Sequence, residues 1–215
     1  MCSSDLWNYD SVDYSRRALY VADTGNNVIR RIGFRLSFEG CPQAKNVETI
    51  AGVAGQAGSN DGLSISARFN APRGVAAAPD GSVYVADTGS QTIRRITAGG
   101  VVTTVAGEPD VRGSNDGAPL LAHFDSPSGI DVDVAGNVYI ADTGNHTIRV
   151  LTTDHRVVTL AGTPRVAGFE DGADAKFNGP VGVKVGHDGS IYVADTSNNA
   201  IRRIILTARR RALRP

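Results

Sequence analysis

The tripeptide Ala-Asp-Thr occurs four times in this chain of 215 residues, each time after an apolar and aromatic run and before a turn. Its aspartates lie 64, 55 and 53 residues apart, at Asp23, Asp87, Asp142 and Asp195. A recurrence of this length, built from strand-like segments, indicates a propeller or an array of β-blades rather than a stack of helices. The chain is therefore a repeat protein.

The remaining landmarks keep the same register, with Asp-Gly, Phe and Pro-x-Gly recurring in order along each unit. Residues 74–107 contain four short β-prone runs separated by Pro-Asp-Gly, Thr-Gly-Ser-Gln and Ala-Gly-Gly, which are turn sequences. Four antiparallel strands make one propeller blade, so the sequence predicts an all-β fold. The predicted blades cover about residues 10–52, 72–107, 127–162 and 180–206, with linkers between them.

The first two runs of each unit are apolar on both faces, which favours a sheet covered by a neighbour on each side. One blade alone cannot bury both faces, and stacking against the next blade supplies the missing contact. In the linker before residue 127 we expect Phe124, Leu120 and Leu121 to wedge between two blades.

Residues 72–96, 127–151 and 180–204 resemble the NHL repeat, which reads Pro-x-Gly, then Asp-Gly, then Tyr-Val-Ala-Asp-Thr-Gly-Asn and an Ile-Arg pair. Residues 17–32 resemble its second half, and the linkers are similar to those of long-period bacterial NHL arrays and of teneurins. The resemblance implies a β-propeller of NHL type, usually a closed ring of six blades. About four four-stranded blades are present here, so we expect an open or incomplete ring whose partners include missing blades or neighbouring domains.

The two ends of the chain depart from the repeat pattern. Met1–Leu6 back-translates as GTG TGC TCT TCC GAT CTN, which resembles the end of a sequencing adapter, and we interpret it as an artefact. Residues 207–215 form a basic tail that we also interpret as foreign, which leaves residues 7–206 for the propeller.

Charge and hydropathy limit the classes of partner. Lys and Arg number 22 and Asp and Glu number 22, so no overall field attracts nucleic acid or an anionic membrane. No apolar run approaches the 18 residues of a spanning helix. The sequence predicts a protein or small-molecule partner at the loops of the propeller ends, and the resemblance favours a bacterial, extracytoplasmic setting.

The repeated aspartates could ring the propeller axis as metal ligands. However, an Asp that ends a strand before Thr-Gly-Asn is well placed to accept N–H groups of the turn, which is a structural role. A residue needed once for chemistry need not recur in each blade. We therefore predict that Asp23, Asp87, Asp142 and Asp195 stabilise turns.

A second acidic set lies in the linkers, in the sequences Ser-Asn-Asp-Gly at 59–62 and 114–117 and Phe-Glu-Asp-Gly at 169–172. Ca²⁺ takes six to eight oxygen ligands, and each of these loops offers two or three without the spacing of a calcium loop. We predict turns and no cofactor.

The arginines of the third strands, such as Arg94 and Arg95, are a third feature. Some NHL propellers bind RNA through a basic face. Here the zero net charge and the lack of aromatic residues beside the arginines favour a structural role, in which one arginine of a strand pairs with a carboxylate and the other arginine is hydrated. RNA binding is therefore kept only as the second alternative function.

For catalysis the chain contains no HxH, HExxH, GxSxG or CxxC motif. The first alternative function, a propeller hydrolase or lyase with a channel metal, would need ligands from missing blades. The favoured function is a non-enzymatic binding scaffold that acts through its loops. The candidate ligand-facing residues are Asn60, Asp61, Arg68, Asn115, Asp116, His123, Glu170, Asp171 and Lys176.

Overall fold

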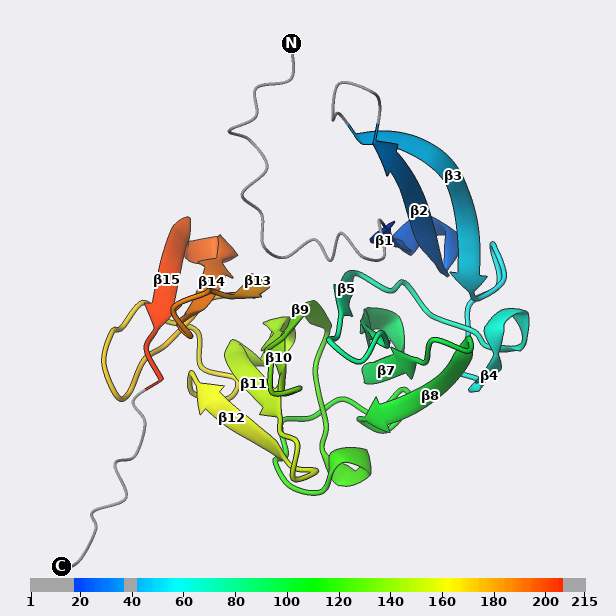
Figure 1. Ribbon diagram of the computed structural model, residues 1–215. Coiled ribbons are helices and arrows are strands. Elements are labelled where there is room, and N and C mark those ends of the chain that lie inside the picture. The colour runs from blue at the N-terminus through cyan, green and yellow to red at the C-terminus, as the bar shows by residue number, and fades with distance from the viewer. Residues whose placement is uncertain (1–17, 37–41, 207–215) are drawn as a thin grey trace, which may run out of the picture.

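The computed structural model describes residues 18–36 and 42–206 as four antiparallel β-sheets joined by linkers. The predictions for residues 1–6 and 207–215 lie outside the described residues. The sheets follow one another around an arc, with one sheet at each end of the arc and β5, β9 and β13 nearest its inside (Figure 1). This arrangement confirms the all-β propeller architecture, and we refer to the four sheets as blades 1 to 4.

The strands of each blade follow the chain from the inside of the arc outward. Blade 1 contains β1 (Ala18–Asp23), β2 (Val28–Leu36) and β3 (Pro42–Ala51). Blade 2 contains β5 (Gly74–Ala77), β6 (Val83–Asp87), β7 (Thr92–Ile96) and β8 (Val101–Ala106), and β4 (Gly62–Leu63) from the preceding linker pairs with the outer edge of β8.

Blade 3 contains β9 (Pro127–Val132), β10 (Val138–Asp142), β11 (Thr147–Leu151) and β12 (Val157–Ala161). Blade 4 contains β13 (Pro180–Val185), β14 (Ile191–Asp195) and β15 (Ala200–Ile204). A complete blade was expected to have four strands, with the first strand of blade 1 degraded and blade 4 ending after its third strand. The described residues form three strands in blades 1 and 4, four in blade 3 and five in blade 2, where β4 is the additional strand.

The only helical elements of the described residues are single 3-10 turns. Four of them follow the Ala-Asp-Thr strands: η2 (Thr24–Asn26), η4 (Thr88–Ser90), η6 (Thr143–Asn145) and η7 (Thr196–Asn198). Each of these turns ends at a residue in the left-handed conformation, with φ between 52° and 61°. Two more, η3 (Ser64–Ser66) and η5 (Pro119–Leu121), lie in the first two linkers.

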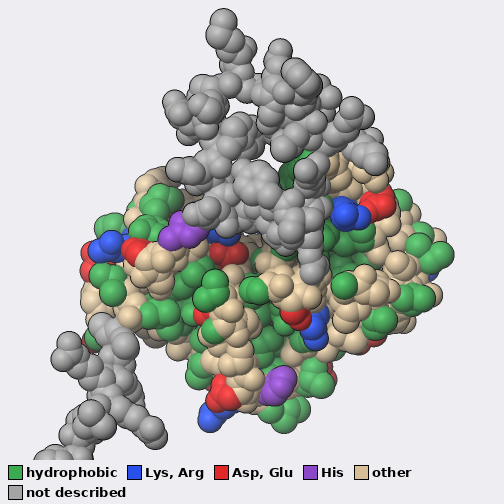
Figure 2. Space-filling view, in the orientation of Figure 1, with side chains coloured by type: hydrophobic (Ala, Val, Ile, Leu, Met, Phe, Trp, Pro, Cys, Tyr) green, Lys and Arg blue, Asp and Glu red, His purple; other side chains and the backbone are tan. Residues whose placement is uncertain are grey.

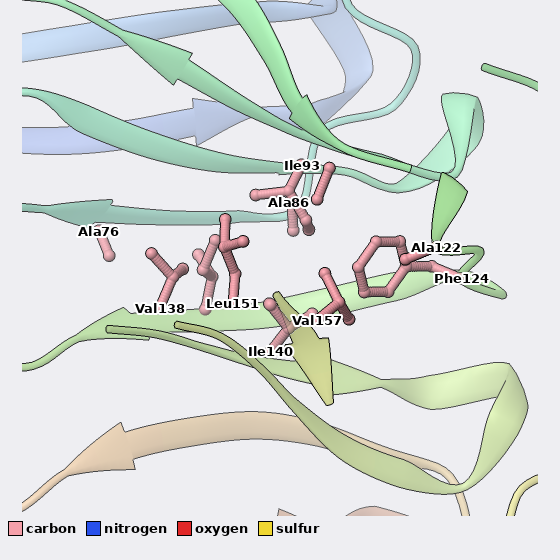
Figure 3. Packing of buried hydrophobic residues seen from close by; sticks show 11 residues of the cluster. Ala76, Ala86, Ile93, Ala122, Phe124, Val138, Ile140, Leu151 and Val157 are labelled. Atoms are coloured by element: carbon pink, nitrogen blue, oxygen red, sulfur yellow. The ribbon is translucent and has the colours of Figure 1, made fainter. Parts of the chain in front are cut away.

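The core lies between successive blades rather than inside one of them. Ala86 and Ile93 of blade 2 face Ile140 of blade 3, and Phe124 of the intervening linker closes the same cluster (Figure 3). Equivalent clusters around Phe69 and Phe177 fill the junctions between blades 1 and 2 and between blades 3 and 4. Each fully buried phenylalanine contributes about 1.5–3 kcal/mol by burial alone.

The expected wedge of three linker residues is only partly correct. Phe124 is fully buried, but the side chains of Leu120 and Leu121 are 58% and 71% exposed. The reason is η5, in which these leucines lie, because the turn follows the outer side of the blades while the chain returns inward only at Ala122. The prediction was therefore wrong for both leucines.

Candidate functional site

The end of the blades that carries the linkers contains most of the candidate residues. In an antiparallel blade the turn between the second and third strands lies at the same end as the start of the first strand, and the linker from the preceding blade arrives there. This end therefore combines the Ala-Asp-Thr turns with the linkers.

Each Ala-Asp-Thr aspartate forms an ion pair with the arginine seven residues later, on the next strand. The Asp87 Oδ2 atom lies 3.0 Å from Arg94 Nη1, and the Asp142 Oδ2 atom lies 2.8 Å from Arg149 Nη1. Antiparallel pairing sets Asp87 opposite Thr92 and Asp142 opposite Thr147, so each arginine, two residues further along the next strand, lies diagonally from the aspartate on the same face of the sheet. In blade 2 both side chains are fully buried, so the pair belongs to the interior.

The remaining contacts of the Arg94 guanidinium bind the linker that enters blade 2. Arg94 donates to the carbonyl oxygens of Arg68 and Asn60, each at 3.0 Å, and its Nη2 atom pairs with Asp61 at 2.7 Å. Its guanidinium also lies 5.2 Å from the centroid of the Phe69 ring, a cation–π distance. One buried arginine thus connects two aspartates, two linker carbonyls and an aromatic ring.

The same arrangement recurs in blades 3 and 4. Arg149 contacts the carbonyl oxygens of His123 and Asn115, and the Asp116 carboxylate. Arg202 contacts Asp195, the carbonyl oxygens of Lys176 and Glu170, and the Asp171 carboxylate. In blade 1 the corresponding pair, Asp23 and Arg30, is longer at 3.7 Å.

The second carboxylate oxygen of each buried aspartate accepts a backbone N–H of the linker. Asp87 accepts the N–H of Asn70 at 2.7 Å, Asp142 accepts that of Asp125 at 2.8 Å, and Asp195 accepts that of Asn178 at 2.7 Å. In the Ala-Asp-Thr turns themselves, the aspartate side chain caps no backbone N–H. Its observed partners are therefore the linker, the arginine and, in three blades, the asparagine side chain three residues later.

Burial dominates the protonation of two of these aspartates. It raises the pKa of Asp87 and of Asp142 from 3.8 to about 6. The N–H donors and the neighbouring arginine favour the ionised form and oppose the loss of hydration, but they do not cancel it.

The linker aspartates are engaged by protein donors on both oxygens. Asp61 accepts the Arg94 guanidinium and the Thr104 hydroxyl on Oδ1, and the Thr104 backbone N–H on Oδ2. Asp116 has the same partners in Arg149 and Thr159. Within residues 18–36 and 42–206, no group of three or more His, Cys, Asp or Glu side chains could hold a metal ion.

The candidate ligand-facing residues form three separate groups, one in each linker, rather than one site. Asn60, Asn115 and Glu170 direct their carbonyl oxygens to the buried arginines, while the residues themselves are exposed. The basic candidate residue of each linker contacts a nearby side chain. Arg68 donates to Gln56, His123 lies 3.3 Å from Glu108, and Lys176 pairs with Glu170 at 2.7 Å.

Sequence reasoning missed the threonine of the tripeptide, although the repeated motif itself contained the signal. Thr88 Oγ1 donates to the Pro127 carbonyl of blade 3 at 2.6 Å, and Thr143 Oγ1 donates to the Pro180 carbonyl of blade 4 at the same distance. It also missed the ion pair between Asp131 of β9 and Lys184 of β13, at 3.1 Å.

A groove of about 490 Å³ lies between blades 2 and 3. Apolar and hydroxyl groups dominate its lining, and its charged or titratable members are Arg95 and His155. Arg95 is already paired with Asp80 at 2.7 Å. The groove therefore offers little uncompensated charge to a ligand. Its lining residues include Tyr84, Arg95, Leu120, Val138, Leu151 and His155.

The molecular surface shows no separation of charge on the face that Figure 2 presents, where acidic and basic side chains lie among hydrophobic ones. Among the described residues, no helix is long and apolar enough to cross a membrane.

Comparisons with known proteins agree with this architecture. Residues 3–122 match the family model of the teneurin NHL domain, and residues 124–151 and 177–204 match that of the NHL repeat. A Bacteroides thetaiotaomicron structural genomics protein of unknown function superposes with a TM-score of 0.71 at 26% identity, over 89% of this chain and 45% of that one.

Two curated relatives are longer proteins. Protein SUPPRESSOR OF QUENCHING 1, chloroplastic, of Arabidopsis thaliana is 36% identical over 64% of this chain and 14% of its own length. NHL repeat-containing protein 2 of Bos taurus is 33% identical over 71% of this chain and 23% of its own length. The chain thus spans less than a quarter of either relative. With more than half of its residues matched by the teneurin NHL model and two further repeats matched by the NHL model, the chain belongs to the NHL-repeat family of β-propellers.

Proposed function

We propose that this propeller is a non-enzymatic scaffold that binds a protein or a small ligand through the exposed side chains of its linkers. One observation carries the proposal. The polar residues that the repeats share make contacts within the fold, whereas the linkers differ from one another at the partly exposed position before each buried phenylalanine, and the third linker differs from the first two in its exposed Phe169-Glu170 pair.

The shared residues are committed to internal contacts. Asp142 binds Arg149 and the linker, and Asp116 binds Arg149 and Thr159. Breaking the buried Asp142–Arg149 pair by removing one partner costs about 3–5 kcal/mol, so these two groups are unsuited to turnover chemistry that would repeatedly break their contacts.

The same contacts hold the linkers in one conformation. Arg149 donates to two carbonyl oxygens of the linker that precede and follow η5, at Asn115 and His123. A loop that is already ordered loses little conformational entropy when it binds a partner. The linkers are therefore preorganised supports for side chains that point away from the blade.

Some of the exposed and partly exposed side chains on these supports differ in charge and size between the linkers. At equivalent positions the first two linkers carry Ser59-Asn60 and Ser114-Asn115, and the third carries Phe169-Glu170. The positions before the buried phenylalanines carry Arg68, His123 and Lys176. Phe169 is 60% exposed and lies over the Arg202 guanidinium at 4.7 Å, so it combines an anchored ring with accessible apolar surface. Aromatic residues, phenylalanine among them, are enriched at protein–protein interfaces relative to the rest of the surface.

A phage-displayed peptide library selected on the immobilised 215-residue chain provides a direct test. Calorimetric titration of the selected peptides should show at least tenfold weaker binding to Phe169→Ser or Lys176→Ala. The matched control is Val134→Ser, because Val134 is 96% exposed in a turn at the opposite end of blade 3. Peptides whose affinity depends on Val134 but on none of the linker residues would contradict the proposal.

The non-enzymatic part of the proposal needs its own measurement. The chain should not hydrolyse p-nitrophenyl acetate or a sugar lactone above the buffer rate in Mn²⁺, Zn²⁺ or Ca²⁺. Metal-dependent turnover that is lost on replacing a channel or linker carboxylate would show that the alternative, a propeller hydrolase or lyase, is correct.

A further inference from the structure

The groove between blades 2 and 3 is lined in part by turns at the end of blade 3 opposite its Ala-Asp-Thr turn. Its apolar lining includes Val138 and Leu151, which belong to the cluster between the two blades (Figure 3). Its rim includes Thr153 and His155, which lie in the turn between β11 and β12 and are exposed. With a volume of about 490 Å³, the groove has the size of a site for a small molecule.

The junction between blades 1 and 2 shows why there is room at this one. There, the Ser64 N–H donates to the Gly100 carbonyl at 2.8 Å and the Ser64 hydroxyl donates to the Ile50 carbonyl at 2.9 Å, so the linker is tied to both blades. The equivalent residue of the next linker is Pro119, which lines the groove. Proline has neither an N–H nor a hydroxyl, so neither hydrogen bond can form between blades 2 and 3.

The turn that faces this linker differs in the same way. Blade 2 has Ala98 and Gly100 at the positions where blade 3 has Thr153 and His155. His155 shares the left-handed backbone of Gly100, with φ of 59° against 82°. The turn therefore keeps its shape, and the rim of the groove gains a hydroxyl and an imidazole that the equivalent turn lacks.

The hydroxyl of Tyr84 is the third distinctive group of the groove. In blade 3 the equivalent Tyr139 donates its hydroxyl to Asp133 at 3.2 Å. Blade 2 has Ala78 in place of that aspartate, and within the described part of the chain the Tyr84 hydroxyl forms no hydrogen bond. Burial raises the pKa of Tyr84 above its ordinary value of 10.0, so the phenol keeps its proton at neutral pH and can donate it to a ligand.

The charges of the groove favour a neutral ligand. Arg95 lies opposite Tyr84 in the register of β6 and β7, and Asp80 compensates its charge at 2.7 Å. A charged ligand would have to disrupt this pair or enter the groove without a counter-charge, and both are unfavourable. The polar groups left for a ligand are the Tyr84 and Thr153 hydroxyls and the His155 imidazole, which lie beside the apolar lining.

We propose that this groove binds a neutral sugar, either a monosaccharide or a disaccharide. A pyranose ring presents apolar C–H surface to the Tyr84 ring and Leu120, and each of its hydroxyls can both donate and accept a hydrogen bond. These hydroxyls match the polar groups of Tyr84, Thr153 and His155, which a purely apolar ligand would leave without partners. The site is separate from the candidate linker residues, because none of those residues lines the groove.

Saturation-transfer NMR on the 215-residue chain tests the proposal. The probes are glucose, galactose, mannose, N-acetylglucosamine, maltose and cellobiose at up to about 20 mM, a range that detects millimolar Kd values. Cyclohexanol, benzoate and choline are the apolar, anionic and cationic comparison probes.

Three substitutions introduce residues that the repeat already contains at equivalent positions. Ala78→Asp supplies a partner for the Tyr84 hydroxyl, Pro119→Ser restores the groups that tie the linker to the blades, and His155→Gly removes the imidazole from the turn. The control is Tyr139→Phe, which removes the equivalent hydroxyl at the junction between blades 3 and 4. The urea midpoint of each variant separates loss of the groove from loss of the fold, and Tyr84→Phe replaces any variant that does not fold.

We expect at least one of these sugars to bind, and each groove substitution to weaken its binding at least fivefold, while Tyr139→Phe changes it less than twofold. The absence of saturation transfer to all of these sugars would overturn the proposal. Sugar binding of equal strength in every folded variant would also overturn it, because the sugar would then bind elsewhere. Binding of cyclohexanol, benzoate or choline that the groove substitutions weaken, with no sugar bound, would assign the groove to another class of ligand and likewise overturn it.

Discussion

The Asp142 Oδ2 atom lies 2.8 Å from the Arg149 Nη1 atom, and neither side chain has appreciable contact with solvent. This pair joins a turn of blade 3 to the linker that enters the same blade, because Arg149 also binds the Asn115 and His123 carbonyl oxygens. The repeat is thus stabilised by buried polar contacts at one end and by apolar packing between blades.

Replacing Arg149 by methionine should lower the free energy of unfolding by about 3–5 kcal/mol, because Asp142 is left buried without its cation. Arg95→Met is the control, since Arg95 forms a partly exposed pair with Asp80 that should be worth less than about 1 kcal/mol. Urea denaturation measures both. Similar losses for the two variants would show that burial of the Arg149 pair has no energetic consequence.

Two classes of buried threonine should respond in opposite directions to replacement by valine. Thr88→Val should destabilise the chain by about 1 kcal/mol, because it removes the hydrogen bond to Pro127 of the next blade. Thr92→Val should be neutral or stabilising, because within the described part of the chain the buried Thr92 hydroxyl has no hydrogen-bond partner. Valine also suits a strand position. Thermal melts of both variants provide the comparison, and an equal loss of stability would contradict the assignment of Thr88 to the junction.

The stability of the chain should depend on pH through Asp142. Burial raises its pKa in the folded state to about 6, above the ordinary value of 3.8, so the folded chain binds the proton more tightly than the unfolded chain. The contribution of this group to stability is therefore fully present below pH about 4 and is lost as the pH rises through about 6.

Asp142→Asn removes this titration. The free energy of unfolding of the original chain, minus that of the variant, should thus decrease between pH 4 and pH 6 by at most about 1.4 kcal/mol per pH unit. Urea titrations at several pH values measure the difference. A difference that increases with pH over this window would show that the Arg149 contact outweighs desolvation.

Millimolar Ca²⁺ should not raise the melting temperature. Both carboxylate oxygens of Asp61 and of Asp116 already accept hydrogen bonds from protein donors, so binding would have to displace Arg94 or Arg149. A bound ion would stabilise the folded chain by about 2.7 kcal/mol at 100 times its Kd. A rise in melting temperature that EDTA reverses would therefore reveal a calcium site.

The repeat pattern in the sequence was sufficient to predict the main strands of the blades, the turns between them and the stacking of blades, but not β4, which comes from a linker. Strand β6 covers Val83–Asp87 and β10 covers Val138–Asp142, as the Ala-Asp-Thr runs indicated. These features follow from short β-prone runs, turn residues and the length of the repeat, all of which are visible in the sequence without knowledge of which residues meet in space. The burial of Phe124 was predicted on the same basis.

The partners of the polar residues were decided by the tertiary structure alone. Asp87 accepts the N–H of Asn70, Arg94 binds carbonyl oxygens 26 and 34 residues away, and Thr88 reaches Pro127 of another blade. Their residue types and spacings are compatible with turns, solvent or a metal, and the choice depends on where the linker lies against the sheet. The exposure of Ile201, set against the complete burial of its sequence equivalents Ile29, Ile93 and Ile148, has the same origin, because burial in this fold is supplied by the neighbouring blade and not by the strand itself.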